Sequence, residues 1–92
     1  MRSRMKEVYR AMAESLGLPI DLALDLPRVI VVGSEQVIIL NHRGLIQYSE
    51  TRLVAGVGGG QVIVDGEDLE IQEIGPEDMA VKGLIRSVHM ET

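Results

Sequence analysis

The sequence predicts a mainly β protein: a small antiparallel sandwich or partly open barrel of short, hairpin-connected strands, preceded by one amphipathic helix. Three observations lead to this fold class. Short β-branched runs follow position 20 and are separated by turn residues about every 8–12 residues. An apolar stripe with the helical period lies before Pro19. No second stripe of that kind follows, which argues against a parallel βαβ sheet.

Residues 3–16 form the predicted helix. Gly17 suits the left-handed residue that ends a helix, and Pro19 prevents continuation. We therefore divide a single domain into a helical segment, 1–18, and an antiparallel β domain, 19–92. The residues of the apolar stripe are Met5, Val8, Tyr9, Met12 and Leu16.

The β domain is expected to contain strands separated by glycine, asparagine, aspartate and proline. The expected strands lie near 28–32, 36–41, 45–49, 52–56, 61–65, 69–74, 79–84 and 86–90. The expected turns are Gly33-Ser34-Glu35, His42-Arg43-Gly44 between Asn41 and Gly44, Gly58-Gly59-Gly60, Asp65-Gly66 and Gly75-Pro76. Pro27 lacks a backbone donor, which suits the first residue of a strand or an edge.

Two of the expected strands, 29–32 and 37–40, are apolar without alternation. A strand with one solvated face alternates, so the second face of these strands needs a cover. The helix, a facing sheet or another protein would serve.

A related pattern, a glycine turn feeding an apolar strand, occurs at 32–39 and again at 57–64. We interpret this echo as recurring hairpin chemistry rather than duplication.

Composition excludes several classes of protein. The chain has 92 residues and no cysteine, so disulfides and thiolate metal sites are excluded and a reducing compartment is compatible. Trp and Phe are absent, and the core must be aliphatic. Apolar runs fall far short of the roughly 20 residues that span a bilayer, and no continuous apolar segment indicates a secretory signal.

Charge is distributed unevenly along the chain. Residues 1–16 carry four basic and two acidic side chains, net +2, whereas residues 17–92 carry five basic and twelve acidic side chains, net −7. An acidic body repels the phosphate backbone, so no nucleic-acid partner is expected.

No candidate catalytic or metal site stands out. His42 and His89 lack paired ligands, and we interpret them as a surface turn residue and a strand residue. The acidic run Asp65-Gly66-Glu67-Asp68 lacks the ligand pattern of a calcium loop, so we interpret it as an Asp-Gly hairpin with solvated carboxylates. The glycines at 58–60 feed a strand rather than a phosphate-binding helix and indicate a flexible hairpin tip. Ser34 and Ser49 have no base at motif spacing. We therefore expect a protein that is not an enzyme, without cofactor, metal or identified small-molecule substrate.

The basic amphipathic helix allows competing interpretations. In the first interpretation, the apolar stripe packs on the β domain and the cationic face lies in water. In the others, the helix anchors at a membrane surface or binds in a groove of a partner protein. Two or three net charges attract anionic lipid weakly, about 1 kcal/mol per basic residue. Membrane association would therefore need a protein partner as well.

Several segments together resemble the small YabP/YqfC sporulation proteins, the YqfC branch most closely. These segments are Leu24-Asp25-Leu26-Pro27-Arg28, Asn41-His42-Arg43-Gly44, the strand 60–64, Gly66-Glu67-Asp68-Leu69-Glu70-Ile71, and Gly83-Leu84-Ile85 followed by Val88. The resemblance covers nearly the whole chain, and its specificity comes from the order and spacing of the segments. The stretch 55–60 is more glycine-rich than the family pattern.

The resemblance implies a non-enzymatic protein made in the mother cell during sporulation. It also implies a membrane protein partner of the YqfD or YabQ type and a role in the spore coat or cortex. The implied location is the mother-cell cytoplasm, peripheral to the forespore-engulfing membrane. No catalytic residues accompany the resemblance.

Two hypotheses follow from the sequence. The first is a protein-interaction module that docks on a membrane protein during spore morphogenesis. The alternative is a self-assembling structural protein, a homo-oligomeric scaffold of the developing spore envelope. A small-ligand carrier is a third and weaker class, because the aliphatic side chains are needed to fill the interior. The candidate partner-binding residues are Arg4, Met5, Val8, Tyr9, Met12, Leu16, Arg28, Asn41, His42 and Arg43.

Overall fold

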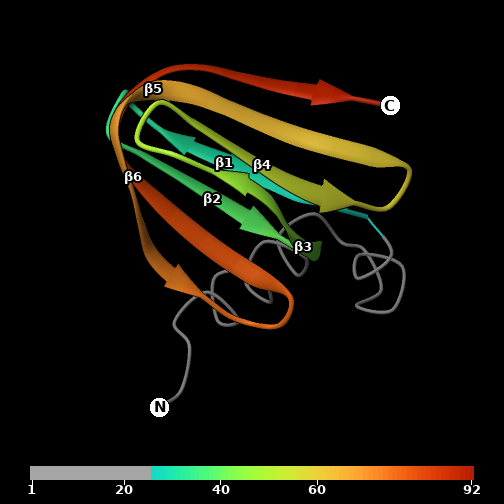
Figure 1. The fold of residues 1–92 in the computed structure, drawn as a ribbon. Coiled ribbons are helices and arrows are strands. Elements are labelled where there is room, and N and C mark those ends of the chain that lie inside the picture. The colour runs from blue at the N-terminus through green and yellow to red at the C-terminus, as the bar shows by residue number, and fades with distance from the viewer. Residues whose placement is uncertain (1–25) are drawn as a thin grey trace.

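The chain forms one open antiparallel sheet of six strands, and this confirms the mainly β class (Figure 1). The computed structural model describes residues 26–92, and the helix predicted within 1–18 lies outside them. No helix is present in the described part. The strands are β1 (Arg28–Val32), β2 (Gln36–Leu40), β3 (His42–Tyr48), β4 (Arg52–Val57), β5 (Gly60–Ile74) and β6 (Asp78–Glu91). Their order in the sheet is β1-β2-β6-β5-β4-β3.

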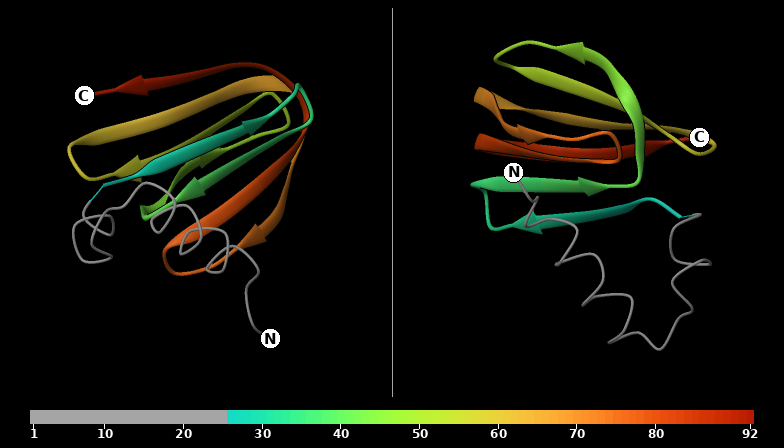
Figure 2. Two further views of the ribbon diagram at one scale, coloured as in Figure 1. Left: turned by 180° about the vertical axis from the view of Figure 1, so that it is seen from behind. Right: turned by 90° about the horizontal axis from the view of Figure 1, so that it is seen from below.

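The sheet bends over on itself because β5 and β6 are long and both curve (Figure 2). β4 pairs only with residues 60–65 of β5, and β2 pairs only with residues 78–82 of β6. One layer therefore contains β3, β4, the first half of β5 and the second half of β6. The other layer contains β1, β2 and the remaining halves. The predicted sandwich or partly open barrel is thus a single bent sheet whose two halves face each other.

The bend corrects the predicted turn at Asp65-Gly66. Residues 61–65 and 69–74 are not separate strands but parts of β5, and 79–84 and 86–90 are likewise parts of β6. Register shifts follow Asp65 and Glu67, where bulges bend a strand without reversing it. A Cβ on Gly66 would collide with the carbonyl oxygen of Leu84, so glycine here permits close backbone approach rather than a hairpin.

Three of the predicted turns are hairpin turns. Glu35 N–H donates to Val32 O at 3.1 Å between β1 and β2. Residues 58–59 join β4 to β5, and Gly75 N–H donates to Asp78 O at 2.7 Å between β5 and β6. The predicted reversal at 41–44 is wrong, because β3 begins at His42 and does not pair with β2.

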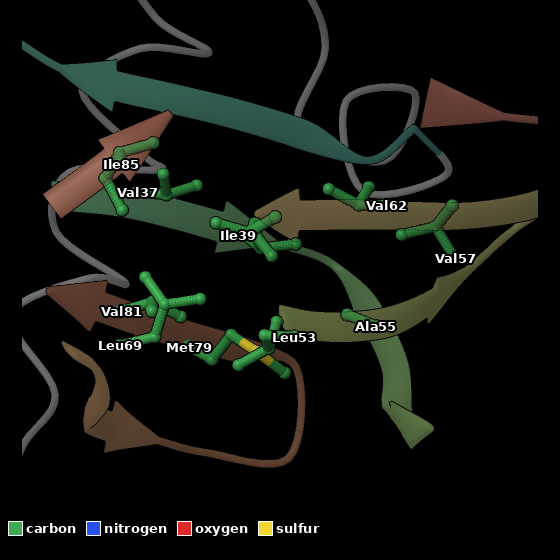
Figure 3. Close-up of a cluster of buried hydrophobic side chains, with 11 residues drawn as sticks. Val37, Ile39, Leu53, Ala55, Val57, Val62, Leu69, Met79, Val81 and Ile85 are labelled. Atoms are coloured by element: carbon green, nitrogen blue, oxygen red, sulfur yellow. The ribbon is translucent and has the colours of Figure 1, made fainter. Parts of the chain in front are cut away.

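The core lies between the two layers and is aliphatic, as the composition predicts. Residues of β2, β4, β5 and β6 point into it, and Met79 supplies a flexible side chain near Leu53 (Figure 3). The two copies of the sequence echo place equivalent residues here, Val37 with Ile39 and Val62 with Val64. The buried cluster is Val37, Ile39, Leu53, Ala55, Val57, Val62, Val64, Leu69, Met79, Val81 and Ile85.

The second face of β1 and β2 is also apolar, as the lack of alternation predicts. Ile30 pairs with Ile38, and Ile38 pairs with Ala80, so one apolar row crosses three strands. Their neighbours Val37 and Val81 point into the core, which places this row on the outside of the bent sheet.

Candidate partner-binding surface

The segment between β2 and β3 is a corner that carries the chain from one layer to the other. Asn41 adopts the left-handed conformation, with φ of 64°, which asparagine tolerates better than most residues. Its side-chain amide donates to Leu26 O at 3.4 Å. The corner therefore meets the segment just before β1, and two of the family-like segments come together in space.

His42 is buried beside this corner, so its interpretation as a surface turn residue is wrong. Only 6% of its surface is exposed. Nδ1 accepts the Gly44 N–H at 2.9 Å, which leaves the proton on Nε2. Nε2 donates to the carbonyls of Gly75 and Asp78, at 3.0 and 3.2 Å. The imidazole thus fastens the corner to the β5–β6 turn. Because the side chain is buried, a partner could contact little of its surface.

Arg43 is exposed and extends over the β4–β5 turn. A Cβ on Gly58 would lie 3.4 Å from Arg43 Nη2, so the guanidinium rests against a glycine that leaves room for it. Gly60 faces the end of β6, where a Cβ would collide with Glu91 O. The collision at Gly60 and the φ of 87° at Gly59 account for two of the three glycines at the predicted hairpin tip.

Arg28 begins β1, directly after Pro27, and β1 is an edge strand as Pro27 predicts. It pairs with Leu40, on the outer side of the sheet. Its Nε is buried and has no hydrogen-bond partner within the described structure. A buried donor without an acceptor costs about 1–3 kcal/mol.

The other predicted partner-binding residues, Arg4, Met5, Val8, Tyr9, Met12 and Leu16, lie outside the described residues. Of the four that are described, Arg43 is exposed and Arg28 is half-buried, whereas Asn41 and His42 shape the corner. A role for any of them in partner binding stays a prediction.

The two edges of the sheet differ. β1 pairs with β2 over five consecutive residue pairs without a register shift. β3 pairs with β4 through two register shifts, and Gly44 within it has φ of 123°. Bulges protect edge strands from pairing with other chains, and β1 has none.

Apolar side chains are exposed along β1 and beside it. Val31 and Val32 are 49% and 47% exposed, and Leu26 just before the strand is 50% exposed. Val31 pairs with the core residue Val37, whereas Val32 pairs with Gln36, so the two valines lie on opposite faces. The margin of β1 is therefore apolar on both faces.

Three acidic side chains of β5 pair with cations on neighbouring strands, and two of them, Glu67 and Glu70, are exposed. The prediction of solvated carboxylates is therefore confirmed for these two residues, whereas the predicted hairpin is wrong because β5 continues through Asp65 and Gly66. Arg52 binds Asp65 through two hydrogen bonds of 2.6 and 3.1 Å, and this contact raises the pKa of Arg52. Two further pairs join Arg86 to Glu67 and Lys82 to Glu70. These pairs cross neighbouring strands, and exposed pairs of this kind add little stability.

An open pocket of about 320 Å³ lies against the bend, lined by Tyr48, Glu50, Asp68, Leu69 and Glu70. Tyr48 closes one side by donating its hydroxyl to Leu69 O at 2.7 Å.

Residues 26–92 contain no group of three histidines or carboxylates arranged to hold a metal ion. His89 lies in β6, as the strand interpretation predicts.

Comparison with known proteins shows the family of this chain. The model of the YabP family matches residues 25–92. The chain belongs to this family. It is 34% identical over 85 residues to a Bacillus subtilis (strain 168) protein described as uncharacterized protein YqfC, covering 92% of this chain and 91% of that protein. No solved structure matches the chain.

Membership of the YabP family is consistent with a sporulation-related protein. Within the described residues, no helix is long and apolar enough to cross a membrane.

Sequence reasoning missed the role of His42 and the orphan Nε of Arg28. The acceptors of His42 lie 33 and 36 residues away, so no local pattern indicates them. The continued apolar alternation from Val62 through Val64 to Gly66 was the one available signal that β5 does not turn at Asp65.

Proposed function

We propose that this YabP-family protein is a non-enzymatic interaction module that acts in the mother cell during spore morphogenesis and docks on a membrane protein of the YqfD or YabQ type. It works in the cytoplasm, at the face of the forespore-engulfing membrane. The observation that carries the proposal is the unprotected apolar margin of β1, where Leu26, Val31 and Val32 are each about half exposed.

Other features support a binding role. Asn41 and His42 of the corner are engaged in holding the fold, and three carboxylates of β5 are engaged in ion pairs. Family membership supports the sporulation context. The basic residues near the N-terminus add weak attraction to anionic lipid, which suits a protein held at the membrane by a partner.

A self-assembling scaffold of the spore envelope is the second candidate. The same observation favours it, because an edge strand without bulges also pairs with copies of itself. Light scattering at tens of micromolar separates the two candidates. A monomer supports docking, and a ring or filament whose formation depends on β1 supports the scaffold.

The docking function is tested by following a fluorescent fusion in sporulating cells with and without the gene for the membrane protein. Signal on the engulfing membrane that disperses when the membrane protein is absent supports docking. Signal that stays on the spore surface in both strains favours the scaffold. Diffuse signal in both strains contradicts both candidates.

A further inference from the structure

We propose that β1 is the docking element, and that it receives an extended, acid-bearing segment of the partner as a seventh strand of the sheet. This inference rests on the proposed docking function and names the surface and the chemistry of the segment that fits it. Strand addition at a sheet edge uses main-chain hydrogen bonds for affinity and alternate side chains for specificity.

The backbone of β1 is ready for this addition. Among the described residues, β1 has a neighbouring strand on one side only. The pairing with β2 continues over Arg28–Val32 without a register shift, so no bulge interrupts the free edge. Neither proline nor lysine interrupts it, and Arg28 is its one charged residue.

The side chains of β1 define the segment that fits. A segment lying along the edge would cover Val31 on one face and Val32 on the other, so it needs apolar side chains on both faces at that end. At the opposite end it would run past Arg28, whose Nε is buried and lacks an acceptor. A carboxylate supplies that acceptor and pairs with guanidinium strongly. The segment therefore combines β-branched residues with one Asp or Glu.

A second copy of β1 does not meet these requirements. The sequence of β1 is Arg-Val-Ile-Val-Val and contains no carboxylate. In an antiparallel pair centred on Ile30, Arg28 would face Val32 of the other copy, and its Nε would stay without an acceptor. β5 does carry carboxylates beyond the bend, at Glu70 and Glu73, but its register shifts there make it a poor edge for pairing. The charge requirement thus favours a different protein as the occupant.

The test measures binding of the full-length chain to the full-length membrane protein in detergent micelles. Val31→Lys places a charge at the edge, and it should weaken binding at least about tenfold, equivalent to about 1.4 kcal/mol. Ile46→Lys is the matched control, because Ile46 is an exposed apolar residue of the other edge strand. It should change binding less than about twofold.

A second measurement keeps the test decisive if Val31→Lys folds poorly. A photoreactive phenylalanine analogue is placed at Val32 or, as control, at Ile46, and crosslinked segments of the membrane protein are identified. The expected crosslink forms from position 32 to an acidic, β-branched segment. Changing the acid of that segment to its amide should weaken binding to the wild-type chain but not to Arg28→Met.

The outcomes separate this inference from the function on which it rests. The β1 inference is overturned, while docking stands, if Val31→Lys binds the membrane protein as tightly as the wild-type chain and no crosslink forms from position 32. No binding by the wild-type chain overturns docking itself and the inference with it. Oligomers of the wild-type chain that Val31→Lys converts to monomers place a second copy at β1 and also overturn the inference.

Discussion

The two edge strands, β1 and β3, lie at opposite ends of the same sheet and both expose apolar side chains, but β3 is tied into the fold by some of its exposed residues. The Tyr48 hydroxyl of β3 donates a hydrogen bond to Leu69 O. The Ile46 side chain lies over Gly56, where an added Cβ would be 3.4 Å from Ile46 Cδ1. The strand begins with the buried His42. In β1, Val31 and Val32 are about half exposed, and the pairing with β2 is regular.

This difference teaches that an apolar edge is not in itself a binding site. β3 deviates from regular pairing at two points, and this makes it a poor template for another strand. β1 combines a regular backbone, half-exposed valines and an unsatisfied cationic donor. Substitutions that loosen the attachments of β3 test whether this contrast is a property of the fold.

The largest expected effect is that of Gly66→Ala, which disrupts the bend that brings β3 and β4 over the core. Gly66 N–H donates to Thr51 O at 3.0 Å, and an added Cβ would collide with the Leu84 carbonyl. We expect a loss of about 3 kcal/mol in the free energy of unfolding, measured by urea denaturation. Gly58→Ala is the control, since its nearest neighbour is the flexible end of Arg43, and it should change stability by less than about 0.5 kcal/mol.

The next effect is that of His42→Ala, which removes the fastening between the corner and the β5–β6 turn. The substitution leaves the Gly44 N–H without its acceptor and removes the imidazole donor from the carbonyls of Gly75 and Asp78, although Asp78 O still accepts the Gly75 N–H. We expect a loss of about 2 kcal/mol by the same measurement. The exposed His89→Ala should be nearly neutral, and equal losses for the two variants would contradict a fastening role for His42.

A smaller effect is expected for Tyr48→Phe, which deletes only the hydroxyl that anchors the end of β3. Loss of its hydrogen bond to Leu69 O should reduce the free energy of unfolding by about 0.5–1 kcal/mol. Amide hydrogen exchange at residues 45–48 should speed up, whereas exchange in β1 should not change. Equal acceleration in both edge strands would remove the distinction drawn between them.

Arg52→Gln should have the smallest effect, although it removes a bidentate ion pair with Asp65. Both side chains are substantially exposed, so water and salt already screen their attraction. We expect no measurable change in the urea midpoint at physiological salt. A clear loss that persists in high salt would show that the β4–β5 pairing depends on this contact.

The fold class was predictable from the sequence because its evidence is local. Val37 with Ile39 and Val62 with Val64 alternate into the core, and Gly33 and Gly75 mark real hairpin turns. The turn predicted at Asp65-Gly66 was wrong because the absence of a side chain on glycine permits either a tight turn or a close approach between backbones. In this structure the approach is to Leu84, which no local pattern reveals.

The candidate surface was only partly predictable. Arg43 is exposed and Arg28 is half-buried, whereas the interpretation of His42 as a surface turn residue is wrong. The burial of His42 depends on carbonyls that the chain reaches only through β5 and β6. The choice between β1 and β3 also required structure, because their places at the edges of the sheet and their pairing registers depend on neighbouring strands.

The most direct test of the account is amide hydrogen exchange of the full chain with and without the membrane protein in micelles. If β1 receives an added strand, exchange should slow at residues 28–32, and residues 42–48 of β3 should keep their rates. Slowing confined to β3, or to residues outside both edges, would contradict the assignment of β1 as the docking edge.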